Sequence, residues 1–202
     1  MKKHLVALFL LAFSSLLLRA QTSGAPPEQF ATFSVWSQRM DMSPYKGKKY
    51  RLSVAIRAEP ASTESYAVAF IRNEPPEGGP RSWVYMDNMA DRPVSDSTWK
   101  TYTLQYAVDK KASWIAFGML GFGSGTYYFD NMRLEVETSK GQWTAIPIPN
   151  GNFEQETLAP WEQTSMGVPV RVIGAAAAAD TQKPFEGKWC FRIKNVFIMP
   201  KE

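Results

Sequence analysis

Between residues 31 and 136 the chain consists of short segments in which apolar and polar residues alternate, separated by turn-forming residues. Tyr50, Leu52 and Val54, for example, fall on one face of an extended strand. The segments lack the three-to-four-residue apolar spacing of an amphipathic helix. The expected strands are 33–42, 50–59, 65–73, 82–89, 98–108, 113–122 and 125–136. Such a run of strands predicts an all-β fold, an antiparallel sandwich or barrel.

The C-terminal part of the chain continues this pattern less regularly. The segments with strand character are 150–155, 168–174 and 188–195, and 196–200 either extends the last of them or forms another strand. The alternatives for the alanine run 175–180 are a helical turn and a loose connector, and its short length beside Gly174 favours the connector. Because a few short strands do not make a core of their own, this tail needs a partner sheet.

The first twenty residues predict a signal peptide. A basic start, MKKH, is followed by the apolar run LVALFLLAFSSLLL and by the small residue Ala20. The alternative is a membrane anchor, but the apolar run is short for a membrane span and a plausible cleavage site follows it directly. We therefore expect residues 1–20 to be removed and the chain to be secreted or periplasmic through the Sec route, with no transmembrane anchor after cleavage.

Removal of the signal limits the available chemistry. The single histidine, His4, lies in the signal, so the mature chain would lack the imidazole of a Ser-His-Asp triad or a histidine-ligated zinc site. Cys190 is the single cysteine, so an internal disulfide is excluded, and its place in an alternating segment predicts a small buried thiol. The carboxylates show no spacing typical of catalytic pairs. We expect no enzymatic activity.

The net charge does not favour nucleic acid as a partner. Three of the 23 basic residues, Lys2, Lys3 and Arg19, lie in the predicted signal and no acidic residue does, so the mature chain would carry 20 basic and 19 acidic side chains. A nearly neutral chain lacks the electrostatic footprint that nucleic-acid binding requires.

Three motifs resemble those of a known group. GKKYRLS (47–53), the W-x-x-Y of Trp99 and Tyr102, and the G-x-x-x-FDN-x-x-L of 125–134 occur in the order found in jelly-roll modules of the galactose-binding-like superfamily. The chain resembles carbohydrate-binding modules of families 4, 9 and 22. It also resembles the jelly-roll modules that precede the catalytic domain of some bacterial C-terminal-processing peptidases, especially in Bacteroidetes. The resemblance implies a jelly-roll β-sandwich with a binding role.

The order of two further motifs differs from that group. NGNFEQ (150–155) and GKWCFRIKN (187–195) would come first in the family, but here they follow the FDN strand. One explanation is a circularly permuted single domain, 21–202, whose first strands are supplied by 148–202. The alternative is a module at 28–137 followed by a truncated second module at 148–202. Permutation is favoured because the front half alone would expose a sheet edge and a hydrophobic face. The tail can pair with the front half of its own chain, which gives a monomer, or with that of a second chain, which gives a domain-swapped dimer.

The resemblance implies a carbohydrate or cell-surface glycan as ligand. Sugar-binding modules of this fold stack aromatic rings on pyranose rings and bind hydroxyl groups with polar side chains. The candidates are Trp83 and Tyr85, with Arg72 on the preceding strand and Gln38 and Asn88 as hydrogen-bonding partners. These residues equally suit packing at the core or rim. The alternative function is therefore a structural or protein-interaction domain without a sugar ligand, accessory to a peptidase or surface complex.

The resemblance also implies a structural calcium ion. Modules of this superfamily often hold Ca²⁺ between a glutamate of the first strand and an aspartate of the last, because this cation prefers several oxygen ligands. The matching positions here are Glu154 and Asp130. If the tail folds onto the front half, these two carboxylates come together.

Overall fold

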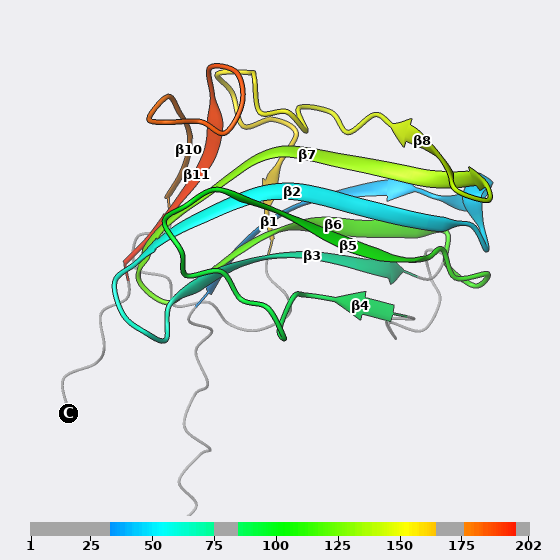
Figure 1. Ribbon diagram of the computed structural model, residues 1–202, viewed down its shortest axis with the longest axis horizontal. Helices are drawn as coiled ribbons and strands as arrows, with labels where there is room; N and C mark the ends of the chain where they lie inside the picture. Colours follow the sequence, from blue (N-terminus) through cyan, green and yellow to red (C-terminus); the bar gives the residue numbers. More distant parts are fainter. Residues whose placement is uncertain (1–32, 75–84, 165–175, 197–202) are drawn as a thin grey trace, which may run out of the picture.

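The computed structural model describes residues 33–74, 85–164 and 176–196, which form two antiparallel sheets packed face to face (Figure 1). Sheet A contains, in spatial order, β4 (Tyr85–Asp87), β3 (Tyr66–Glu74), β6 (Trp114–Phe122), β1 (Phe33–Asp41) and β9 (Glu162–Gln163). Sheet B contains β10 (Ala176–Asp180), β11 (Cys190–Asn195), β7 (Gly125–Ser139), β2 (Lys49–Pro60) and β5 (Lys100–Ala107), with β8 (Gln142–Ile146) beside β7. The all-β jelly-roll sandwich predicted from the sequence is confirmed.

The alternating segments of the front half became strands because each one buries its apolar face. Tyr50, Leu52 and Val54 of β2 are fully buried between the sheets. On the facing sheet, Phe117 of β6 is equally buried. The short 3-10 turn η1 (Ser43–Tyr45) joins β1 to β2, and within the described ranges no helix is long and apolar enough to cross a membrane.

Three segments differ from their sequence-based predictions. The alanine run, expected to be a connector, forms β10, because its pairing with β11 outweighs the weak strand preference of alanine. Residues 150–155, expected to form a strand, make a turn in which Asn150 and Phe153 have positive φ angles of 49° and 54°. The stretch after Ser139, for which the alternation pattern predicted no strand, contains β8. The predicted strand 168–174 lies outside the described residues.

The tail packs against the front half of the same chain. Phe191 of β11 is paired with Phe129 of β7, and the ring of Phe191 lies 5.6 Å from that of Trp36 on β1. The backbone N–H of Met132 donates to the carbonyl of Gly151 over 2.7 Å. Both parts of the chain thus contribute to one hydrophobic core. These contacts do not test whether the strands of 148–202 correspond to the first strands of related modules. Circular permutation therefore stays a prediction.

Candidate functional site

Sheet A has one face toward sheet B and one face away from it, which we call its outer face. Trp36 and Phe117 point toward sheet B, since their rings contact Phe191 and Trp161 of the tail. Side chains of a strand alternate between its two faces. Arg39 of β1 and its neighbours in register therefore lie on the outer face.

A group of aromatic and charged side chains lies at one end of this outer face. Trp114, the first residue of β6, is in register with Asp41 of β1 and with Glu74 of β3. Two residues further along the same strands, and therefore on the same face, Arg39 and Arg72 lie on either side of β6. We call these five residues the Trp114 cluster. It brings together an indole, two carboxylates and two guanidinium groups from three neighbouring strands.

Ion pairs fix the arrangement of the Trp114 cluster. Arg39 Nε lies 2.7 Å from Glu74 Oε2, and Arg72 Nη2 lies 2.6 Å from Glu74 Oε1. The guanidinium carbon of Arg39 lies over the Trp114 ring, 5.2 Å from its centroid. The Arg39 side chain is 47% exposed and that of Glu74 is 14% exposed. The cluster is therefore both ordered and accessible from solvent.

An aromatic row occupies the opposite end of the same face. The Phe122 ring lies between those of Phe33 and Tyr66, with centroid distances of 5.2 Å and 4.6 Å. Between this row and the Trp114 cluster, Val68 and Phe70 are buried. Among the residues that the structure describes, the accessible aromatic groups on the outer face of sheet A thus lie at its two ends.

The ligand residues predicted from the sequence are distributed over several places. Arg72 belongs to the Trp114 cluster. Gln38 lies on the face toward sheet B and donates from Nε2 to the carbonyl of Pro149 over 2.9 Å. The Asn88 side chain accepts a hydrogen bond from the backbone N–H of Ala90. Tyr85 is the first residue of β4, with its backbone opposite Asn73, and Trp83 lies outside the described residues. Their roles in binding stay predictions.

The sequence analysis did not select Trp114, Arg39 or Glu74. A signal was present, because charged residues alternate at the ends of the segments that became β1 and β3, where polar side chains share a face. The sequence did not show that β6 would lie between these two strands. The pairing of β6 with both β1 and β3 brings these side chains together into one site.

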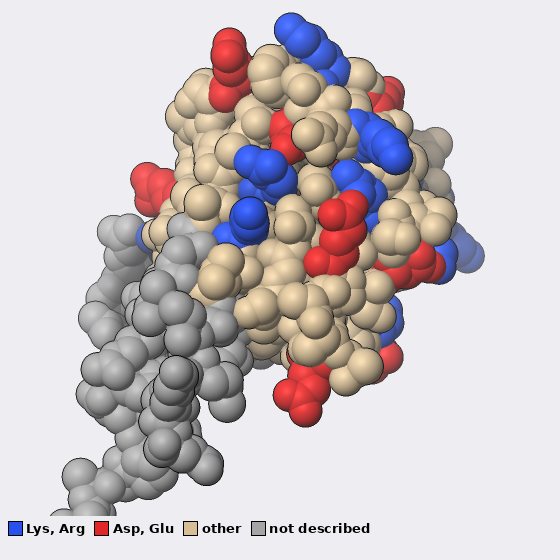
Figure 2. Space-filling view, turned by 90° about the vertical axis from the view of Figure 1, so that its left-hand side faces the viewer, with Lys and Arg blue, Asp and Glu red and all other residues tan. Residues whose placement is uncertain are grey.

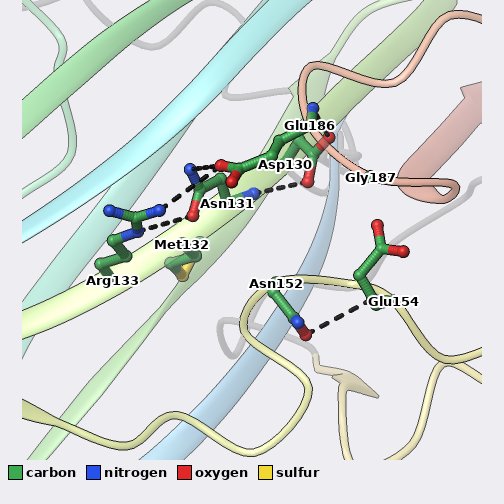
Figure 3. Close-up of a pocket in the computed structure, with 8 residues that line it drawn as sticks. All are labelled: Asp130, Asn131, Met132, Arg133, Asn152, Glu154, Glu186 and Gly187. Carbon is green, nitrogen blue, oxygen red and sulfur yellow. Dashed lines mark hydrogen bonds and ion pairs between the residues drawn. The ribbon is translucent and has the colours of Figure 1, made fainter.

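The two predicted metal ligands, Asp130 and Glu154, line one pocket beside the loop that joins β10 to β11 (Figure 3). The Asp130 carboxylate accepts hydrogen bonds from the backbone N–H groups of Asn131, Phe185 and Glu186, over 2.6, 2.8 and 3.1 Å. Burial raises the pKa of Asp130 to about 6, although these three bonds lower it, and the nearby charge of Glu154 adds to the increase.

The donors around these carboxylates do not fit a calcium ion. Glu154 also accepts backbone hydrogen bonds, from Lys188 and Trp189. Calcium prefers six to eight oxygen ligands, whereas N–H groups face both carboxylates here. The described part of the chain holds no cluster of three or more His, Cys, Asp or Glu side chains suited to a metal. Calcium at this site stays a prediction from the resemblance.

Comparisons with known proteins assign the chain to no family. No family model matches the chain, and no curated protein matches it. A solved structure titled "CBM4 structure and function" is similar, with a TM-score of 0.39 and 18% sequence identity over 55% of this chain. The match spans 66% of that structure, just under two thirds of its length. The class defined by the fold is an all-β jelly-roll sandwich of two antiparallel sheets.

Proposed function

We propose that this chain is an exported, non-catalytic module that binds a carbohydrate at the Trp114 cluster. The observation that carries the proposal is the position of Trp114 between Asp41 and Glu74, with Arg39 lying over its ring. An indole provides an apolar surface on which the C–H face of a sugar ring stacks. Carboxylates and guanidinium groups around it accept and donate hydrogen bonds to hydroxyl groups.

The charged groups of the cluster suit binding better than catalysis. Glycoside hydrolysis requires a carboxylic acid with a raised pKa opposite a second carboxylate. Here the hydroxyl and backbone N–H of Ser43 lower the pKa of Asp41, and Glu74 is engaged by two arginines. Cys190 is buried, and burial raises the pKa of its thiol to about 12, which does not suit a nucleophile.

Export rests on the signal sequence predicted at residues 1–20. A secreted or periplasmic location would give the module access to polysaccharides and cell-surface glycans. Detection of a mature N-terminus near Gln21 in the secreted or periplasmic fraction would test this part of the proposal.

We expect Trp114→Ala to weaken polysaccharide binding at least about tenfold, since an aromatic anchor at the centre of a site contributes about 1.4 kcal/mol or more. Trp114→Phe keeps a ring and should retain most of the binding. Isothermal titration against a panel of neutral and acidic polysaccharides measures both effects. Circular dichroism shows whether each variant keeps its fold.

Trp143→Ala is the matched control. Trp143 lies on the outer face of sheet B, with the guanidinium carbon of Arg51 4.5 Å from its ring centroid, and Arg51 pairs with Glu135. The control thus removes an indole with the same kinds of neighbours from the opposite side of the sandwich. If Trp114→Ala and Trp143→Ala bind the polysaccharide with equal affinity, the ligand does not bind at the Trp114 cluster. Binding to no polysaccharide would contradict the function and favour a protein-interaction domain.

A further inference from the structure

The loop between β10 and β11, residues 181–189, is held by two carboxylates that come from other parts of the chain. Asp130 of β7 accepts from the backbone N–H groups of Phe185 and Glu186. Glu154, in the turn that starts the tail, accepts from Lys188 over 2.9 and 3.0 Å and from Trp189 over 3.2 Å. Four backbone donors of the loop are thus satisfied by two side chains.

Gly187 shapes the loop around Glu154. Its φ angle is 71°, in the left-handed region that favours glycine. A Cβ atom at this position would lie 2.1 Å from Glu154 Oε1. Consecutive backbone N–H groups next to such a residue form a concave site for an anion. The Glu154 carboxylate is the anion that fills this site.

Arg57 of β2 and Trp99, the residue before β5, hold the first part of the same loop. Arg57 Nη2 donates to the carbonyl of Gln182 over 3.2 Å, and Trp99 Nε1 donates to the carbonyl of Lys183 over 2.9 Å. Charges of both signs are mixed over the end of the molecule that carries β10 and β11 (Figure 2). The loop therefore has hydrogen-bond partners along its length, and these partners are protein groups.

We propose that Asp130 and Glu154 are anchors for the loop 181–189, and that the tail of this chain folds without the calcium ion that the family resemblance predicts. A cation between the two carboxylates would have to compete with the N–H groups that face them. A loop turned to offer carbonyl oxygens would lose these hydrogen bonds. The carboxylates themselves thus connect β7, the turn at Glu154 and the start of β11.

The first test is thermal unfolding of the full mature chain with excess EDTA and with millimolar CaCl₂. We expect the same melting temperature in both. A higher melting temperature in calcium, or a loss in EDTA that calcium restores, would overturn the proposal. Amide NMR signals of Lys188 and Trp189 in the wild type provide a second readout. We expect them to stay unchanged through a calcium titration, and their displacement would also contradict the proposal.

The second test compares Gly187→Ala with Gly141→Ala. Both glycines have left-handed φ angles, 71° and 77°, so both substitutions introduce similar backbone strain. A Cβ at Gly141 would meet no atom within 4 Å, whereas at Gly187 it would collide with Glu154. We expect the larger fall in melting temperature for Gly187→Ala. Equal falls would mean that backbone strain alone matters and would contradict the role of Glu154.

Glu154→Gln tests the role of the carboxylate, because it removes the negative charge and keeps the size of the side chain. It keeps one acceptor oxygen and replaces the other with an N–H donor that faces the loop. We expect hydrogen exchange of the Lys188 and Trp189 amides to become at least about tenfold faster, because the loop opens more often. Exchange at the wild-type rate would overturn the proposal.

Discussion

Trp161→Ala is expected to lower the free energy of unfolding by about 3–5 kcal/mol, the usual cost of removing a large aromatic side chain from a core. Trp161 is only 3% exposed. Its ring lies 6.0 Å from that of Phe117 in sheet A and 5.4 Å from that of Phe153 in the tail. Its Nε1 donates to the carbonyl of Asn150 over 3.0 Å. One side chain therefore joins the tail to the front half.

Urea denaturation followed by circular dichroism measures this effect. Trp189→Ala is the control, because Trp189 is partly exposed and its ring contacts the ammonium group of Lys188, 5.0 Å from the ring centroid. We expect the control to lose less than about 1 kcal/mol, as most surface substitutions do. A similarly small loss for Trp161→Ala would show that the tail does not share the core in solution.

The free energy of unfolding is expected to fall as the pH rises from 4 to 7, because of Asp130. Its pKa is about 6 in the folded chain and about 3.9 in an unfolded one. The folded state therefore holds the proton more tightly, and this group stabilises the fold fully below its unfolded pKa. That contribution is lost as the pH rises through about 6. The difference amounts to about 2 kcal/mol between pH 4 and pH 7, because at pH 4 about half of the unfolded carboxyl groups are already ionised.

The difference in unfolding free energy between wild type and Asp130→Asn isolates this contribution, because asparagine does not titrate. We expect the wild type to lose about 2 kcal/mol relative to the variant from pH 4 to pH 7. Carbon NMR of the Asp130 carboxyl gives its pKa directly. In Glu154→Gln this pKa should fall, since the neighbouring negative charge is removed. A difference that stays constant with pH would contradict the prediction.

The sequence by itself determined which segments of the front half are strands. Alternation with a period of two places residues such as Leu52 and Val54 on one face, and burial of that face requires a second sheet. The β-sandwich follows from this local pattern. The predicted pair of Asp130 and Glu154 does line one pocket, but the sequence did not show that backbone N–H groups would face both carboxylates.

Tertiary structure alone decided the neighbours of each strand. The alanine run became β10 because β11 lies beside it, and residues 150–155 became a turn that places Phe153 in the core. Trp114 lies between Asp41 and Glu74 because β6 pairs with both β1 and β3. Strand pairing joins residues far apart in the chain, and its register depends on how the whole core packs. For this physical reason the candidate site appears only in the folded structure.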